Sequence, residues 1–360
     1  MFLKSISLHH FRNYLSQKVE FGRGINIFSG RNAQGKTNLL EAIYFLSTGR
    51  SFRTTRVTEL IRHGSKALHI NGLIERQGSV VNLSINYSEN NKIAQINARR
   101  AARFQEIVGL LNVVIFAPDD IEIIKGPPLN RRRYLDIQIA QTNKNYIKKL
   151  YQYNQVVRQR NAVLRSRKLS TLDVWNDELV KHGVTIVLER KKTMRRLSPL
   201  ARLAHRKIAE GKEELWIEYS SLVKGSEQAE MEESFRGLLR SRAEQEKKNG
   251  VTMVGPHRDE IIFTINGLDA RSYASEGQRR SAVMALRLAQ YEFVKSGGEE
   301  KPIVLIDDVT ADLDPMRKRA FLPLLNEKGQ IFAATASDEK VFENQAGARL
   351  FTIEKGAVVC

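Results

Sequence analysis

A glycine-rich segment that ends in Lys and Thr constrains the fold of this 360-residue chain more than any other feature. It follows the apolar run Ile25 to Phe28 and precedes residues with helical spacing that stop at Gly49. The segment matches the phosphate-binding pattern G-x-x-x-x-G-K-[ST] and reads Gly30-Arg31-Asn32-Ala33-Gln34-Gly35-Lys36-Thr37. A chance match is the alternative. The flanking strand and helix are the context that the pattern requires, and they favour a nucleotide-binding loop.

Each residue type in this loop has a physical role toward phosphate. Glycines let the backbone wrap closely around phosphate groups, so that N–H groups and the helix N-terminus face the negative charge. We expect Lys36 to neutralise β- and γ-phosphate oxygens and Thr37 to offer its hydroxyl to Mg²⁺. The loop therefore predicts that ATP or GTP binds together with Mg²⁺.

An apolar run that ends in two carboxylates is the expected partner of this loop. Ile303 to Ile306 is followed by Asp307 and Asp308. A strand of this kind carries the acidic residue that holds Mg²⁺ in nucleotide-hydrolysing proteins. We assign Asp307 to Mg²⁺ and Asp308 to orienting the attacking water. The alternative is a buried strand that ends in a turn, but two adjacent acids without a cation repel each other.

About 270 residues separate Thr37 from Asp307, so two distant parts of the chain must meet in one sheet. At about 100 to 200 residues per domain, the length suffices for two domains or for one domain with a large insertion. We expect residues 1–125 and 251–360 to form the two parts of an α/β ATPase head, with a mixed sheet built from both parts. Residues 126–250 are then an inserted, mainly helical and basic arm.

The spacing of apolar residues supports this division. Before about residue 115, short β-type runs alternate with turns, and the phosphate-loop helix interrupts them. From about residue 130, apolar residues recur every three or four positions and predict long helices. The first helical seam is expected to contain Ile147, Leu150, Asn154, Val157, Asn161 and Leu164. After about residue 250, helix and strand patterns alternate, as in an α/β fold.

Positive charge is concentrated in the expected arm. The chain has a net charge of +18, and residues 125–212 hold 22 basic against 6 acidic residues, a net +16. A solvated helical surface is one interpretation and a nucleic-acid-binding face is the other. Because surfaces normally mix both signs, the second is favoured. The candidate DNA contacts are Arg131, Arg132, Lys148, Lys149, Arg158 and Arg160.

Composition excludes several classes of protein. Hydrophobic residues make up 42% of the chain and charged residues 27%, which rules out disorder as the main state. No apolar run approaches about 18 residues and no signal-peptide pattern opens the chain, so we expect a cytoplasmic protein that does not enter a membrane. The single cysteine, Cys360, cannot form an internal disulfide, and the seven histidines lack metal-binding spacing.

A third motif, Ser275-Glu276-Gly277-Gln278, precedes a predicted helix about 30 residues before Asp307. Alone it could be a helix N-cap. Between the other two motifs it resembles the signature motif of ABC-type ATPases, and the following Asp312 and Asp314 resemble the D-loop of that class. The resemblance implies an ABC-type head whose Ser275, Gly277 and Gln278 face the γ-phosphate bound by a second subunit. It therefore implies a homodimer that shares two ATP molecules.

Three further segments narrow the resemblance. They are Phe11-Arg12-Asn13-Tyr14, Pro118-Asp119 with Gly126-Pro127 and Arg131 to Asp136, and Gly255-Pro256-His257-Arg258-Asp259. Over essentially the whole chain, these motifs resemble the RecF family of SMC-like ATPases. The chain departs from the ABC pattern where that pattern expects a Gln, within Phe116 to Asp120, and near the switch His, where Thr335 stands. We therefore expect ATP binding with slow hydrolysis.

The family resemblance implies a role in DNA replication, recombination and repair. It implies ATP-dependent dimerisation on duplex and gapped DNA, a weak DNA-dependent ATPase that acts as a switch, and a nucleoid-associated location. It also implies that RecR and RecO act with the protein to load RecA at single-strand gaps and stalled forks. Two alternatives stay open: an ABC-type transport ATPase, and a DNA-binding protein whose ATP site only changes conformation.

Overall fold

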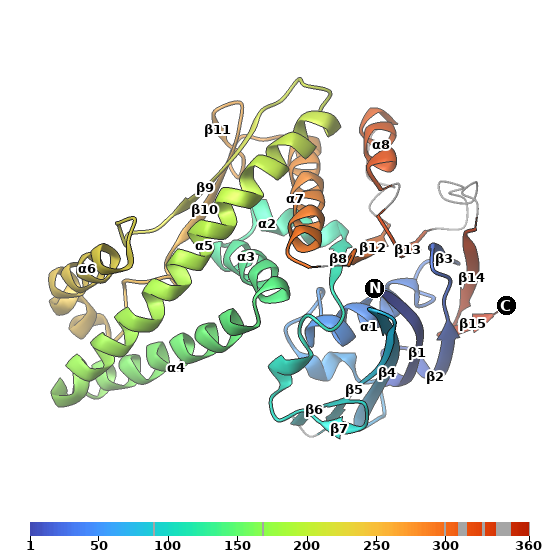
Figure 1. Ribbon diagram of the computed structural model, residues 1–360, viewed down its shortest axis with the longest axis horizontal. Coiled ribbons are helices and arrows are strands. Elements are labelled where there is room, and N and C mark those ends of the chain that lie inside the picture. Colours follow the sequence, from blue (N-terminus) through green and yellow to red (C-terminus); the bar gives the residue numbers. More distant parts are fainter. Residues whose placement is uncertain are drawn as a thin grey trace.

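The computed structural model describes residues 1–88, 91–167, 169–298, 300–308, 315–325, 328–335 and 347–359. Figure 1 shows a strand-rich part that holds both chain termini and a helical part from which a long arm projects. The three sheets lie in these two parts, and the phosphate loop lies in the strand-rich one.

An antiparallel sheet forms one side of the strand-rich part, in the order β2-β1-β4-β5-β6-β7. Its strands are β1 (Phe2–Phe11), β2 (Tyr14–Glu20), β4 (Ala67–Arg76), β5 (Ser79–Ser88), β6 (Asn91–Ile96) and β7 (Arg99–Arg100). The sheet packs against α1 (Lys36–Thr48). The helix ends as the sequence predicts, because Gly49 takes the left-handed conformation with φ of 64° and its N–H donates to the Phe45 carbonyl.

A second, mixed sheet is built from both ends of the chain, in the order β15-β14-β3-β13-β12-β8. Its pairs are parallel except for β14 with β15. Its strands are β3 (Ile25–Ser29), β8 (Val113–Phe116), β12 (Ile303–Asp307), β13 (Ile331–Ala334), β14 (Arg349–Glu354) and β15 (Ala357–Val359). This confirms the predicted α/β head with a mixed sheet from the N- and C-terminal parts.

Both faces of the mixed sheet are covered, which explains why its central strands are almost entirely apolar. Successive side chains of a strand point to opposite faces. Ile115 and Leu305 pack with α1 and the antiparallel sheet. Phe116 and Ile306, one residue further along each strand, pack with the helical part. The sheet is therefore the layer that joins the two cores.

The helical part contains a small antiparallel sheet and most of the helices. Its strands are β9 (Leu215–Ser220), β10 (Glu260–Ile265) and β11 (Leu268–Asp269). The helices that follow the phosphate-loop helix are α2 (Glu122–Lys125), α3 (Pro128–Thr142), α4 (Lys144–Ser166), α5 (Leu172–Ile208), α6 (Gln228–Asn249), α7 (Glu276–Ser296) and α8 (Pro315–Phe321). Short 3₁₀ turns are Val57–Leu60, Phe104–Ile107, Pro118–Ile121, Leu169–Thr171 and Leu322–Leu325.

The arm consists of α4 and the first half of α5, with α6 packed across them near the tip (Figure 1). The second half of α5 runs back along α7. β9 and β10 pair with each other from opposite sides of residue 250. The helical core therefore continues across the predicted boundary between arm and C-terminal head, and the boundaries 125/126 and 250/251 stay a prediction.

The predicted seam of α4 is confirmed at Leu164, which is buried, and at Leu150 and Val157, which pack against the core, but it is wrong at Asn154. Tyr146, Tyr153 and Val156 are buried, whereas Asn154 is exposed. The two tyrosines turn inward because their rings bury apolar area while their hydroxyls find polar partners inside. The Tyr146 hydroxyl donates to Asp136 at 2.5 Å. Sequence spacing alone treats Tyr as an ambiguous residue, so the register of this helix depends on its packing.

Candidate nucleotide-binding site

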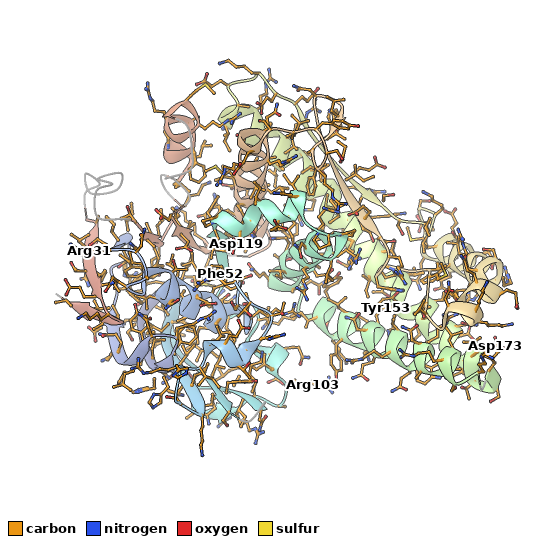
Figure 2. The ribbon with its side chains drawn as sticks, turned by 180° about the vertical axis from the view of Figure 1, so that it is seen from behind. Arg31, Phe52, Arg103, Asp119, Tyr153 and Asp173 are labelled. Carbon is orange, nitrogen blue, oxygen red and sulfur yellow. The ribbon has the colours of Figure 1, made fainter. Side chains whose placement is uncertain are left out.

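The phosphate loop connects β3 to α1 through three residues with positive φ. Gly30 has φ of 147°, Ala33 of 64° and Gly35 of 126°. A Cβ atom on Gly30 would overlap the carbonyl oxygen of Ile353. Glycine is therefore required for the loop to pass so close to β14. Arg31, which Figure 2 labels at the edge of the strand-rich part, is exposed. The loop thus forms a backbone cradle at a helix N-terminus, an arrangement suited to phosphate.

Lys36 and Thr37 begin α1 and bring the two distant motifs together. The Lys36 side chain is buried, and its ammonium donates hydrogen bonds to the carbonyl oxygens of Gly30 and Arg31. Burial lowers the pKa of Lys36, and the nearby carboxylates oppose that effect. Thr37 Oγ1 donates to Asp307 Oδ1 at 2.7 Å across 270 residues of sequence. The loop and the acidic strand end therefore form one site.

Asp307 and Asp308 lie at the carboxyl end of β12. Asp307 is 6% exposed, and burial raises the pKa of its carboxyl to about 6 despite the hydrogen bond from Thr37. Asp308 takes a left-handed conformation with φ of 52°, and its N–H donates to the Ala334 carbonyl at 3.2 Å. A hydroxyl and a carboxylate are the hard oxygen ligands that Mg²⁺ prefers. The donor set therefore fits Mg²⁺, and Thr37 and Asp307 are the residues that would hold it.

The segment Phe11 to Tyr14 supports the phosphate loop through hydrogen bonds. In the sequence, only the family resemblance singled it out. The Arg12 guanidinium donates to both carboxylate oxygens of Glu41 at 2.8 Å, and Glu41 on α1 is completely buried. Asn13 Nδ2 donates to the Gln34 carbonyl at 2.8 Å, and the Tyr14 hydroxyl donates to the Gly35 carbonyl at 3.0 Å. These contacts fix carbonyl groups on the far side of the loop.

The C-terminal hairpin holds the same loop from the other edge. The Gln34 carbonyl accepts a hydrogen bond from the Gly356 N–H at 2.9 Å, and Gln34 Oε1 accepts one from the Lys355 N–H at 2.7 Å. Gly356 has φ of 77°, and a Cβ there would overlap the Asn13 carbonyl oxygen. Sequence reasoning missed this support, because an isolated Lys-Gly turn carries no sign of its distant partner.

The signature segment begins α7 with a capping box. Ser275 Oγ accepts from the Gln278 N–H at 3.2 Å, and Gln278 Oε1 accepts from the Ser275 N–H at 2.9 Å. The local reading as an N-cap is therefore correct, and it leaves Ser275 exposed next to Tyr273, which is 72% exposed. In the described part of the chain, no hydrogen bond or ion pair joins Ser275–Gln278 to Gly30–Thr37.

A buried ion pair ties the signature helix to the segment after β8. The Arg287 guanidinium in α7 donates to both carboxylate oxygens of Asp120. Asp120 also accepts from the Ala117 N–H at 2.9 Å. Its neighbour Asp119 is exposed, lies where the two parts of the molecule meet (Figure 2), and adds to the raised pKa of Asp307. Residues at the expected Gln position thus connect β8 to α7.

The segment Gly255 to Asp259 lies in the helical core and anchors the arm. His257 Nε2 donates to the Thr252 carbonyl at 3.1 Å, so Nδ1 accepts from the Tyr153 hydroxyl at 2.5 Å. Burial lowers the pKa of His257 to about 4. The Pro256 carbonyl accepts from Arg190 of α5 at 2.6 Å. The role of His257 is therefore to join α4 to the loop before β10 as a neutral side chain.

Two of the predicted DNA contacts are wrong. The guanidinium of Arg131 is buried and pairs with Glu260 at 2.6 Å and 3.0 Å. Arg160 is 2% exposed and donates to Glu246, which is completely buried, at 2.6 Å. Arg131 and Arg160 are at most 3% exposed, and their guanidinium groups end on carboxylates inside the protein, so both arginines are structural.

The other four candidate DNA contacts differ in how exposed their side chains are. Lys148 and Arg158 are exposed on α4, and Lys149 is half-buried on the same helix. Arg132 is also half-buried, and it donates to the Asp259 carbonyl at 2.8 Å. Three of the six candidates, Lys148, Lys149 and Arg158, therefore lie on α4 with exposed or half-buried side chains.

Asp312 and Asp314 of the expected D-loop lie outside the described residues. Thr335, near the expected switch position, is buried after β13, and its N–H donates to the Phe28 carbonyl at 3.0 Å. No helix in the described ranges is long and apolar enough to cross a membrane.

Comparison with known proteins identifies the family of this chain. Residues 2–358 match the model of the RecF/RecN/SMC N-terminal domain. DNA replication and repair protein RecF of Symbiobacterium thermophilum is 40% identical, over 100% of this chain and 98% of that protein. Its counterpart in Pediococcus pentosaceus is 36% identical, over 100% and 99% of the two chains. This chain belongs to the RecF family.

Solved structures agree with this assignment. The structure of the recombination mediator protein RecF-ATP in the RecFOR pathway matches with a TM-score of 0.92 at 34% identity, covering 99% of this chain and 97% of that one. An Smc head domain from Pyrococcus furiosus matches with a TM-score of 0.58 at 17% identity, which shows a shared fold. The RecF-family chain described here therefore has an SMC-like, ABC-type ATPase head.

Proposed function

We propose that this chain is an ATP-dependent, DNA-binding recombination mediator that acts in DNA replication and repair. The hydrogen bond between Thr37 and Asp307 carries the proposal, because it assembles loop and acidic strand end into one nucleotide site. A relative of the same fold is named as RecF with ATP, which supports ATP as the nucleotide. RecR and RecO are the proposed partners for loading RecA at gaps. The proposed location of the protein is the cytoplasm, in association with the nucleoid.

The residues of the site have separate tasks. The amides of Gly30 to Thr37 bind phosphate oxygens, and Lys36 neutralises their charge. Mg²⁺, when bound, would add positive charge at the phosphates. Asp308 orients the attacking water and accepts its proton, as a carboxylate near the reacting phosphate can. With no Gln between Phe116 and Asp120, turnover is slow and serves as a switch.

The second half of each site comes from another copy of the chain. Ser275, Gly277 and Gln278 lie at the N-terminus of α7, where Ser275 is exposed, and they have no bond to the phosphate loop of their own chain within the described residues. In a two-fold dimer, each signature segment faces the γ-phosphate held by the partner. ATP binds the dimer better than ADP does, so hydrolysis of ATP releases the pair.

The arm supplies the DNA-binding surface. Lys148, Lys149 and Arg158 lie along α4, and their charges attract phosphate without reading bases. Duplex and gapped DNA are the proposed ligands, and no sequence preference is expected. In the transport alternative, the ATPase would bind a membrane subunit. That role gives no reason for a basic surface on α4.

Dimerisation tests the proposal. Analytical ultracentrifugation of the wild-type protein with Mg²⁺ should show a dimer with ATP and a monomer with ADP. Lys36→Ala should lose tight ATP binding in calorimetry, because it removes the charge that faces the phosphates. Ser275→Arg should bind ATP as a monomer and fail to dimerise, because bulk stands where the partner's γ-phosphate docks.

Ser272→Arg is the matched control, since Ser272 is exposed three residues before the cap and hydrogen-bonds Asp269. It should dimerise like the wild-type protein. Wild-type protein that stays monomeric with ATP and duplex DNA would refute the shared site, and so would a Ser275→Arg protein that dimerises normally.

A further inference from the structure

Arg317 in α8 lies against the glycine of the signature segment. A Cβ atom built on Gly277 would overlap Nη1 of Arg317 and lie 3.4 Å from its Cζ. The guanidinium therefore occupies the space beside Gly277, which lies in the first turn of α7. Glycine at this position has a physical reason beyond its motif, because any side chain would displace Arg317.

Glu213 holds this guanidinium in place. Arg317 Nη2 donates to Glu213 Oε1 at 3.1 Å, and both side chains are largely buried. Glu213 lies between α5 and β9, so the ion pair links α8 to the turn that follows α5. His205 Nε2 lies 3.6 Å from Glu213 Oε2. Burial lowers the pKa of His205 to about 4, so Arg317 is the cation that faces Glu213 at neutral pH.

The positive charge of Arg317 lies at the N-terminus of α7. The N-terminus of a helix carries partial positive charge from its unpaired N–H groups, so it favours anions and disfavours cations. A guanidinium placed there is repelled unless an anion lies next to both groups. Glu213 supplies one anion from one side. The same helix N-terminus is the one that, in the proposed dimer, meets the partner's γ-phosphate.

We propose that Arg317 is a further ATP-binding residue, which acts in trans beside Ser275 and Gly277 on the γ-phosphate bound by the partner subunit. This inference rests on the proposed shared-site dimer. A guanidinium offers several N–H donors in a planar fork, and charge-assisted bonds of this kind to phosphate are strong. Glu213 is a positioning residue that keeps the fork at Gly277.

Arg317→Ala tests the contact, with Arg319→Ala as the matched control. Arg319 lies on the same helix and is exposed, so both variants remove one arginine from α8. In sedimentation with ATP and Mg²⁺, Arg317→Ala should weaken dimerisation by at least about 10-fold, as expected for a lost bond to a charged group. Its monomer should bind ATP with unchanged affinity in calorimetry. Arg319→Ala should match the wild-type protein.

A mixing experiment separates action in trans from action within one chain. A dimer of Lys36→Ala with Arg317→Ala contains one site with both an intact phosphate loop and an intact Arg317 from the other chain. With the Lys36→Ala chain labelled, we expect it to form ATP-dependent heterodimers with Arg317→Ala at least as readily as with wild-type protein. A folding defect, or a contact within one chain, would not be rescued in this way.

The outcomes distinguish a failure of the proposed shared-site dimer from a failure of the role of Arg317 alone. Wild-type protein that fails to dimerise with ATP would overturn the proposed function and this inference with it. Wild-type dimers together with normal Arg317→Ala dimers would overturn this inference alone. Dimers of Arg317→Ala that form with ADP would also overturn it, since they would show that Arg317 blocks the partner and does not bind its nucleotide.

Discussion

The buried pair of Arg160 and Glu246 gives the sharpest test of how the arm divides its arginines between structure and DNA. Arg160 donates to Glu246, to Asn176 at 2.8 Å and to Thr252 at 3.0 Å. Arg160→Met leaves Glu246 as a buried carboxylate without its cation. Breaking a buried ion pair by removing one partner costs about 3–5 kcal/mol. We expect a loss of stability of that size.

Replacing both partners should recover much of the loss. In Arg160→Met with Glu246→Met, no buried charge is left. The remaining cost is the hydrogen bonds that Asn176 and the Met253 N–H lose, at about 1 kcal/mol each, because the Thr252 hydroxyl keeps its bond to Asn161. The double variant should therefore lose about 2 kcal/mol and be more stable than the variant with Arg160→Met alone.

Urea unfolding at pH 7 measures these free energies, and fluorescence anisotropy measures affinity for duplex DNA. The folded double variant should bind DNA like the wild-type protein, because Arg160 does not reach the surface. The control is Arg158→Met, two positions earlier and exposed. It should change stability by less than about 0.5 kcal/mol and still weaken DNA binding. A double variant less stable than Arg160→Met, or one with weakened DNA binding, would refute the reasoning.

Three further tests concern the site and the arm. Asp308→Asn should keep ATP binding in calorimetry and slow hydrolysis, because an amide cannot accept the proton of water; wild-type turnover would contradict the role. Reversing the charges of Lys148 and Arg158 should lower the salt dependence of duplex binding by about 0.9 per lost phosphate contact, and an unchanged slope would show that α4 is only solvated. Wild-type stability should fall as the pH drops from 6.5 toward 4, because buried His257 has a pKa of about 4 and the unfolded chain binds its proton first. His257→Gln should reduce that fall in urea unfolding, and identical pH profiles would argue against a neutral buried imidazole.

The phosphate loop could be predicted from the sequence because all its determinants are local. Gly30 to Thr37 form one continuous segment, and their backbone conformation follows from residue types within eight positions. The apolar strand that ends at Asp307 is also contiguous. Runs that are apolar at every position pack with both faces covered, which fits the α/β head that the sequence indicated.

The supports of the loop could not be predicted, because their partners are remote. Asn13 reaches the carbonyl of Gln34, and Gly356 reaches the same carbonyl from the other end of the chain. Nothing in the sequence spacing distinguishes these residues from ordinary turn residues. The contact of Arg317 with Gly277 is of the same kind, since α8 and α7 approach each other only in the folded protein.

The charge of the arm was fixed by composition, and its use was decided by tertiary structure. A count of basic residues cannot tell Arg158 from Arg160, which are two positions apart on one helix. A rotation of about 200° around the helix axis separates them, at about 100° per residue. Arg160 faces α6, where Glu246 comes 86 residues later to meet it, and Arg158 faces solvent. Packing sets that rotation through buried rings such as Tyr153, because their burial releases more free energy than a surface charge contributes.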